Sequence, residues 1–251
     1  MKNNKALVVL SGGQDSTTCL FWAKQQFEEV HAITYSYGQR HWRELEAAKK
    51  VAELAGVASH EFLTIEDAIK DYSPMTKSDV ELKQYESIED LPGKGVQSTF
   101  VPGRNIIFLT IGANRAWQLG ARNLVTGVCQ EESGGYPDTT IVFVQALQTA
   151  LTAGMGEGFE IHAPLMYMTK AETIQLARDL PGCYDALAHT HTAYDGQYPP
   201  TGHDHATVLR AKGFLEAGVP DPLIVRAWKE GLMELPNTPN YATLVPTHLK
   251  G

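Results

Sequence analysis

The sequence predicts an α/β protein built on a mostly parallel sheet with helices on both faces, followed by a small C-terminal helical subdomain. Short apolar runs alternate with amphipathic helix patterns along residues 6–180. A glycine-rich turn follows the first apolar run, and the composition shifts after Pro181-Gly182, where His, Tyr, Pro and Gly become frequent. We therefore expect one domain over residues 1–180 and a subdomain over residues 181–251 packed on it.

Five short segments predict the strands of the sheet. They are Ala6–Leu10, Glu29–Tyr35, His60–Leu63, Asn123–Thr126 and Phe159–His162. Each has the length typical of a strand. In open parallel sheets, ligands bind beyond the carboxyl ends of the strands. We expect the ligand site there, after the first strand.

Helix patterns occupy the intervals between the predicted strands. They are Asp15–Gln26, Trp42–Ala55, Asn105–Leu119, Thr140–Thr152 and Thr169–Leu180, with two shorter ones at Thr207–Ala217 and Asp221–Leu232. Thr169 and Glu172 have the spacing of a capping box. Residues 66–99 show no clear period and contain Ser-Pro and Pro-Gly pairs, which predicts an inserted loop over the sheet.

Composition excludes several classes of protein. A net charge of −8 over 251 residues argues against a broad nucleic-acid footprint, which needs clustered Lys and Arg. No apolar run approaches the ~20 residues of a membrane helix, and Met1–Lys5 lacks a signal-peptide core. The cysteines Cys19, Cys129 and Cys183 predict neither a disulfide framework nor a thiolate metal site. We expect a cytoplasmic protein that acts on a small molecule, without membrane association or extended nucleic-acid binding.

The most informative segment is Ser11-Gly12-Gly13-Gln14-Asp15-Ser16, directly after the first strand. Small residues let the backbone close around an anion, and the next helix points its positive dipole end there. The segment lacks the Gly-Lys-Ser/Thr ending of a Walker A loop, which disfavours γ-phosphate transfer. It resembles the pyrophosphate-binding loop of the N-type ATP pyrophosphatases, which put AMP on a substrate oxygen. The alternative is an ordinary strand–turn–helix connection.

Three further segments carry side chains suited to a nucleotide or substrate. Tyr35–His41 leaves the second strand with two aromatics, an Arg and a His. Phe100–Asn105 begins a helix with a Pro-Gly turn and Arg104, whose guanidinium suits bidentate phosphate contact. Gly127–Asp138 contains glycines, carboxylates and an amide, which can form a concave polar loop that accepts hydrogen bonds from the aminopyrimidinone edge of a base. Each segment also has an alternative without a ligand. Tyr35–His41 would be a plain strand-to-helix turn, Phe100–Asn105 a capped helix with a surface arginine, and Gly127–Asp138 a solvated acidic turn.

Together these segments resemble the 7-cyano-7-deazaguanine synthase family of the N-type ATP pyrophosphatases. The resemblance runs from about Ala6 to Gly218 and also includes Pro164–Met166, Thr169–Glu172 and Leu209–Phe214. It implies a Rossmann-like fold of the adenine nucleotide alpha-hydrolase type. It also implies ATP-dependent adenylation of 7-carboxy-7-deazaguanine and its conversion with ammonia to 7-cyano-7-deazaguanine, with release of AMP and pyrophosphate.

The resemblance and the chemistry of the residues give an expected site. The predicted contacts of ATP and pyrophosphate are Ser11, Gly12, Gly13, Gln14, Asp15, Ser16, Thr17 and Arg104. The predicted catalytic residues are Asp15, Ser16, Arg104 and Lys170. The two cations face the triphosphate, which Mg²⁺ bridges. The predicted substrate contacts are Tyr37, Gln39, Arg40, Gln130, Glu131 and Asp138.

Ammonia is itself a nucleophile, so the sequence shows no obligate side-chain general base. Arg40 and His41 are the residues that could tune or deliver a proton. We expect the protein to act as a homodimer.

The chain departs from the family where four thiolates would bind a structural zinc. Those positions hold Ala193, Thr201, Asp204 and Thr207. We therefore expect no zinc, but an ordered segment beside the nucleotide site, packed by Tyr194 and Tyr198, with Asp204 or Thr207 capping the next helix. The alternative is a replacement metal site made by His189, His191, His203 and His205.

A second departure is Thr139-Thr140-Ile141, where the family continues Cys-Arg-Asp after Asp138. With the missing thiolates, it leaves two other functions open. One is an adenylating paralogue that stops at the amide or joins the deazaguanine to a protein or nucleic-acid amine. The other is a non-catalytic nucleotide-binding scaffold, against which the intact Ser11–Ser16 loop argues.

Overall fold

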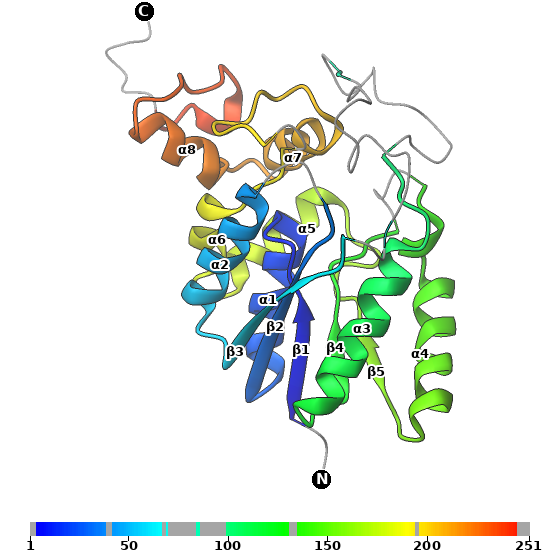
Figure 1. The fold of residues 1–251 in the computed structure, drawn as a ribbon. Helices are drawn as coiled ribbons and strands as arrows, with labels where there is room; N and C mark the ends of the chain where they lie inside the picture. Colours follow the sequence, from blue (N-terminus) through cyan, green and yellow to red (C-terminus); the bar gives the residue numbers. More distant parts are fainter. Residues whose placement is uncertain are drawn as a thin grey trace, which may run out of the picture.

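The computed structural model describes residues 4–38, 42–66, 69, 84–85, 99–130, 135–193 and 196–244. The strands in these ranges are β1 (Lys5–Val9), β2 (Glu29–Ser36), β3 (Ser59–Thr64), β4 (Asn123–Val125) and β5 (Glu160–His162). They form one sheet in the order β3-β2-β1-β4-β5, and every pairing that the described residues show is parallel (Figure 1). The predicted α/β class with a parallel sheet is confirmed.

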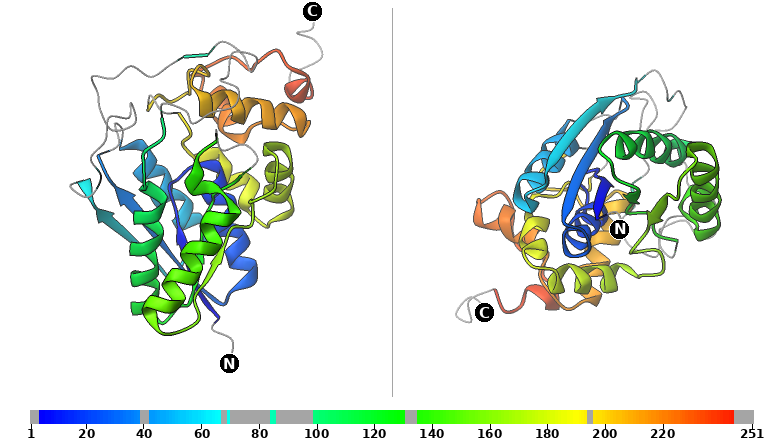
Figure 2. Two further views of the ribbon diagram at one scale, coloured as in Figure 1. Left: turned by 90° about the vertical axis from the view of Figure 1, so that its right-hand side faces the viewer. Right: turned by 90° about the horizontal axis from the view of Figure 1, so that it is seen from below.

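Helices cover both faces of this sheet. One face carries α1 (Gln14–Gln26), α2 (Arg43–Ala55), α5 (Lys170–Asp179) and α6 (Cys183–Ala186), and the other carries α3 (Arg104–Gln118) and α4 (Ile141–Met155). Figure 2 shows the sheet between these two layers. Beyond the carboxyl edge lie α7 (His205–Glu216) and α8 (Pro222–Lys229) (Figure 1). Within the described ranges, each helix is too short or too polar to cross a bilayer.

Alternation along the strands explains why the sheet has two cores. On β1, Ala6 and Val8 point to the α1 side, whereas Leu7 between them points to α3 and α4, and each is at most 1% exposed. On β4, Val125 and Leu124 divide in the same way. A parallel strand covered on both faces needs apolar residues at every position, which is why the sequence shows runs rather than alternation.

The predicted helices differ from the observed ones mainly at their ends. The predicted end at Thr152 is too early, since α4 continues to Met155 and ends where Gly156 adopts a left-handed φ of 76°. The predicted start at Thr207 is too late, since α7 begins directly after Asp204. The capping box is confirmed, because the Glu172 carboxylate accepts the Thr169 N–H and the Thr169 hydroxyl accepts the Glu172 N–H.

In the part of the chain that the structure describes, four short helices were not predicted. They are α6 and the 3₁₀ turns Pro137–Thr139 (η2), Leu187–His189 (η3) and Pro239–Tyr241 (η4). Segments of three or four residues are too short to show a helical period. The predicted loop over residues 66–99 lies almost entirely outside the described residues.

Helices α5 and α7 approach so closely that only glycine fits between them. A Cβ on Gly213 would lie 2.6 Å from the Cβ of Lys170 and 3.1 Å from Ile174 Cδ1. This contact joins the C-terminal helices to the sheet domain and fixes the backbone that carries Lys170.

We predict that Gly213→Ala lowers the free energy of unfolding by about 1–3 kcal/mol, because the added methyl group forces α7 away from α5. The matched control is Gly154→Ala in α4, where an added Cβ meets no atom within 4 Å. It should raise stability by up to ~1 kcal/mol, because alanine favours helix over glycine. Urea unfolding measures both, and equal stabilities of the two variants would contradict the close contact.

Candidate active site

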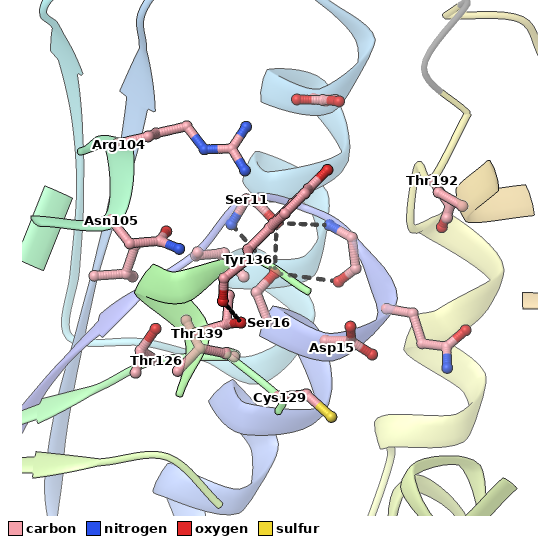
Figure 3. Close-up of a pocket in the computed structure, with 18 of the residues that line it drawn as sticks. Ser11, Asp15, Ser16, Arg104, Asn105, Thr126, Cys129, Tyr136, Thr139 and Thr192 are labelled. Atoms are coloured by element: carbon pink, nitrogen blue, oxygen red, sulfur yellow. Dashed lines mark hydrogen bonds between the residues drawn. The ribbon is translucent and has the colours of Figure 1, made fainter. Parts of the chain in front are cut away.

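A cavity of about 350 Å³ opens at the carboxyl edge of the sheet (Figure 3). It lies beyond the ends of β1 and β4, where the strand order reverses and the following loops run to opposite faces. This is the place where the sequence predicts the ligand site. Residues from all sides line it, among them Ser11, Glu44, Arg104, Gly127, Lys170 and Thr192.

The Ser11–Ser16 loop forms the floor of the cavity and is held by its own serines. The hydroxyls of Ser11 and Ser16 lie 3.0 Å apart. The Ser16 hydroxyl also accepts the Ser11 N–H at 3.2 Å, and the Ser11 hydroxyl accepts the Gly13 N–H at 3.3 Å (Figure 3). The Ser11 and Ser16 hydroxyls therefore lie together at the N-terminal end of α1. Helix N-termini with such donors are common phosphate-binding sites.

Gly12 lets this loop pack directly against the backbone of α2. Its φ is 85°, and a Cβ there would lie 2.5 Å from the Glu44 carbonyl oxygen and 2.7 Å from the Ala48 nitrogen. Its carbonyl accepts the His191 N–H at 2.9 Å. Gly12 and Thr17 are not among the residues that line the cavity, and the Thr17 hydroxyl donates to the Gly13 carbonyl at 2.8 Å. Both hold the shape of the loop.

Lys170 reaches the start of α1 from α5. Its ammonium donates to Asp15 Oδ2 at 2.6 Å, and the two side chains are 15% and 30% exposed. Within the described part of the chain, Asp15 Oδ1 and Gln14 Nε2 are buried without a hydrogen-bond partner. A buried polar atom without a partner costs about 1–3 kcal/mol. A ligand that supplies partners for both atoms would therefore gain affinity.

Arg104 faces the loop from the opposite wall. It is the first residue of α3 and follows Gly103, which caps the helix with a φ of 74°. Its guanidinium points toward Ser11 in Figure 3 and lies 6.0 Å from the centre of the Tyr37 ring. The cavity thus joins Arg104, Tyr37, Lys170, Asp15 and Ser16, all predicted as site residues.

Two other predicted substrate contacts that the structure describes, Gln130 and Asp138, do not line this cavity. Gln130 Oε1 accepts the Ile141 N–H at 3.1 Å, at the start of α4. Asp138 is buried, and its Oδ2 accepts the Asn105 N–H at 3.2 Å. Both side chains hold loops to helix starts, and their contact with a substrate stays a prediction. Gln39, Arg40, His41 and Glu131 lie outside the described residues.

Tyr136 and Glu44 are among the lining residues that the sequence did not predict as site residues. Tyr136 lies across the cavity in Figure 3 and exchanges a 2.5 Å hydrogen bond with Thr99, and burial raises the pKa of its phenol. Glu44 lines the wall from the first turn of α2. Burial raises the pKa of Glu44 to about 7, although the nearby Arg104 charge opposes this. In sequence, Glu44 looks like an ordinary acidic residue of a helix start.

The segment that contains Ala193, Thr201, Asp204 and Thr207, for which we expect no zinc, is hydrogen bonded. Asp204 Oδ1 accepts the N–H groups of Ala206 at 2.9 Å and Thr207 at 3.0 Å, which confirms the predicted cap of α7. The Tyr198 hydroxyl donates to Glu230 at 2.6 Å, and Arg226 lies 4.5 Å above its ring. Tyr194 lies outside the described residues.

The described residues contain no cluster of three or more His, Cys, Asp or Glu side chains placed to hold a metal. The absence of zinc stays a prediction.

Arg210 links three parts of the same segment. It forms a bidentate pair with Asp221 at 2.6 and 2.8 Å, and both side chains are 4% exposed. It also donates to the hydroxyls of Thr190 at 2.8 Å and Thr192 at 2.9 Å. Since Thr192 lines the cavity, this buried network holds the cavity wall to α7 and to the start of α8.

Comparison with known proteins gives consistent matches over most of the chain. Residues 5–218 match the family model described as queuosine biosynthesis protein QueC. The 7-cyano-7-deazaguanine synthase of Chromobacterium violaceum is 49% identical over 230 residues, which cover 91% of this chain and 96% of the relative. The same enzyme of Bacillus subtilis is 42% identical over 219 residues, covering 86% and 96%.

Similarity to solved structures is weaker. A 4-thiouridine synthetase in complex with RNA and ATP is 15% identical with a TM-score of 0.49, covering 91% of this chain and 53% of that one. A predicted tRNA methyltransferase subunit from Methanocaldococcus jannaschii is 18% identical with a TM-score of 0.43, covering 69% and 74%.

We predict that the purified protein holds no stoichiometric zinc and that chelators leave its unfolding midpoint unchanged. Ala193, Thr201, Asp204 and Thr207 offer no thiolate, and a structural zinc site contributes folding energy directly. Elemental analysis of protein prepared without added metal, with unfolding curves with and without EDTA, measures this. One tightly held zinc per chain would contradict it and point to the His189–His205 imidazoles.

We also predict that Arg210→Ala lowers the free energy of unfolding by about 3–5 kcal/mol, because it leaves Asp221 buried and unpaired. The control is Lys50→Ala, which removes an exposed pair with Glu53 at 3.9 Å and should change stability by less than about 1 kcal/mol. Denaturant unfolding compares the two variants. If Arg210→Ala lowered the free energy of unfolding no more than Lys50→Ala does, the Arg210 network would contribute little to stability.

Proposed function

The chain belongs to the family of queuosine biosynthesis protein QueC, and on that premise we propose its reaction. It adenylates 7-carboxy-7-deazaguanine with ATP and converts it with ammonia to 7-cyano-7-deazaguanine, releasing AMP and pyrophosphate. Family membership itself makes the chain a ligase-type enzyme of queuosine precursor synthesis. The observation that carries the proposal is the Ser11–Ser16 loop at the floor of a cavity that Arg104 and Lys170 share.

The proposed chemistry explains why the cavity needs such a loop. A carboxylate resists attack by ammonia because its oxygen is a poor leaving group. Transfer of AMP to that oxygen, with loss of pyrophosphate, makes an acyl-adenylate that ammonia can attack. Adenylation of the resulting amide oxygen, followed by loss of AMP, gives the nitrile. The protein must hold the phosphates, neutralise developing charge and exclude water.

The phosphate-binding groups come from three elements. We assign pyrophosphate to the serine hydroxyls of the Ser11–Ser16 loop and to Gln14 Nε2, a buried donor without a partner in the described part of the chain. Arg104 offers a bidentate cation from α3, and Lys170 offers a compact one from α5. Their positions on opposite walls allow both to contact one polyphosphate.

Asp15 fits the Mg²⁺ ion that normally accompanies ATP. Its Oδ1 is buried and lacks a hydrogen-bond partner among the described residues, and Mg²⁺ prefers carboxylate oxygens. Asp15 would therefore hold the ion at the start of α1. The ion would supply charge neutralisation on the phosphate oxygens.

Among the described residues, Tyr37 is the predicted substrate contact that lines the cavity, and with Tyr136 and Phe108 it offers aromatic surface to a planar base. Gln39, Arg40, Gln130, Glu131 and Asp138 remain proposed contacts. We further propose a homodimer, a cytoplasmic location and the division of the chain near residue 180.

A specific observation keeps one rival reaction in view. Thr139, the first residue of the stretch that departs from the family pattern, lines the cavity. If the side chains at Thr139–Ile141 alter this wall of the cavity relative to the family, the enzyme would stop at the amide or pass the activated deazaguanine to a protein or nucleic-acid amine. A non-catalytic scaffold is the rival from another class, and it makes no AMP.

We predict that the purified protein with ATP, 7-carboxy-7-deazaguanine and ammonia forms AMP, pyrophosphate and the nitrile. Chromatography resolves the nucleotides, and mass spectrometry distinguishes nitrile from amide. Formation of ADP would overturn the proposal, since the loop lacks the lysine of γ-phosphate transfer. Accumulation of the amide alone would establish the first rival, and the absence of AMP would establish the scaffold.

Ser16→Ala and Asp15→Asn should lower the rate of adenylation by about 100-fold, the scale of losing one preorganised electrostatic contact. The control is Gln25→Ala, an exposed residue near the other end of α1. Substrate-dependent exchange of pyrophosphate into ATP measures the rate, and circular dichroism checks the fold. Wild-type exchange rates in both loop variants would move the phosphate site elsewhere.

A further inference from the structure

Glu44 is a carboxylate in the cavity wall to which the proposed reaction gives no role. It lies in the first turn of α2 and lines the cavity together with Ser11, Asp15, Arg104 and Lys170. None of the residues that the structure describes forms a hydrogen bond or ion pair with its side chain. A half-buried carboxylate without such partners is unfavourable for folding, so its presence in the cavity points to a role in function.

The position of Glu44 is fixed by the floor of the cavity. Its carbonyl oxygen lies 2.5 Å from the point that a Cβ on Gly12 would occupy, so its backbone packs directly on the loop. The loop is proposed to hold the pyrophosphate. Groups that border the loop therefore border the bond that breaks between pyrophosphate and AMP, and hence the carboxyl group whose oxygen becomes adenylated.

The charges around Glu44 come from several elements. Arg104 on α3 faces it and favours its charged form. Asp15 on α1, Lys170 on α5, and the imidazoles of His191 and His205 line the same cavity. Burial outweighs the Arg104 charge and raises the pKa of Glu44 to about 7. A group with a pKa near the working pH exchanges protons most effectively.

We propose that Glu44 accepts the protons released from the substrate nitrogen, a role that rests on the proposed function. In amide formation, the nitrogen lone pair of ammonia forms the C–N bond. The bond between the carbon and the AMP oxygen breaks, its electron pair leaves with AMP, and one proton passes from nitrogen to the Glu44 carboxylate. In nitrile formation, the nitrogen lone pair of the amide forms the second C–N bond as the amide oxygen receives AMP, and one proton leaves the nitrogen. The C–O bond to AMP then breaks, the nitrogen supplies the electron pair of the third C–N bond, and the second proton leaves. Each proton passes in turn to the Glu44 carboxylate, which releases it to solvent before accepting the next.

The test is Glu44→Gln, which keeps the size of the side chain but cannot accept the proton. Exchange of pyrophosphate into ATP with 7-carboxy-7-deazaguanine should stay within about twofold of the parent rate. Amide formation with ammonia should fall by about 100-fold, the usual contribution of a general base. Glu46→Gln is the control, because Glu46 is an exposed carboxylate in the same helical turn, and it should match the parent in both assays.

Two further readouts separate a proton acceptor from a structural group. The parent rate of amide formation should rise as the pH passes through about 7, because the carboxylate deprotonates there, and Glu44→Gln should lose this dependence. In Glu44→Ala, added formate should restore part of the rate by acting as an external base in the vacated space.

Three results would overturn the role of Glu44. Equal loss of pyrophosphate exchange and amide formation would make it a group that positions the loop or ATP. A raised KM for the deazaguanine with unchanged kcat would make it a contact to the N–H edge of the base. Unchanged kinetics would give it no role. If the parent protein itself shows no exchange, the proposed function fails, and the Glu44 role fails with it.

Discussion

The close contact between Gly12 and the backbone of α2 is the constraint on which the cavity depends. A Cβ on Gly12 would lie 2.5 Å from the Glu44 carbonyl oxygen, so any side chain there would separate the loop from the helix. The same residue accepts the His191 N–H at 2.9 Å, which ties the C-terminal segment to the loop. One residue without a side chain thus sets the relative positions of the Ser11–Ser16 loop, helix α2 and the C-terminal segment around the cavity.

The cavity brings two cations to the Ser11–Ser16 loop within a chain of net charge −8. Arg104 comes from α3 and Lys170 from α5, and the loop adds the N-terminal end of α1. The field in a cleft follows from the charges that line it rather than from the total, so an acidic chain can still bind a polyphosphate. Lys170 is held in place twice, by its 2.6 Å ion pair with Asp15 and by the packing of its backbone against Gly213. Overall acidity and anion binding are therefore compatible.

Sequence reasoning succeeded where the information is local. The strands, the cap at Thr169 and the loop at Ser11 depend on neighbours within a few positions, and each was predicted from its own segment. It failed where distant segments meet. Glu44 becomes a cavity residue only because Gly12 draws α2 against the loop, and no periodicity in its helix carries that information. The pairing of Arg210 with Asp221 is likewise visible only once α7 and α8 are placed.

The Arg210 network bears on how this chain manages without the thiolates that related sequences are expected to have. A zinc site cross-links a loop to a helix start, and Arg210 does so as well, by joining Thr190, Thr192 and Asp221. The two devices differ in physical character. A buried ion pair stabilises only when every charge and donor finds its partner, since its desolvation cost is nearly as large as its attraction. Because Thr192 also lines the cavity, any change that loosens this network would reach the site directly. The shape of the cavity therefore depends on the same hydrogen bonds and ion pair that stabilise the C-terminal segment.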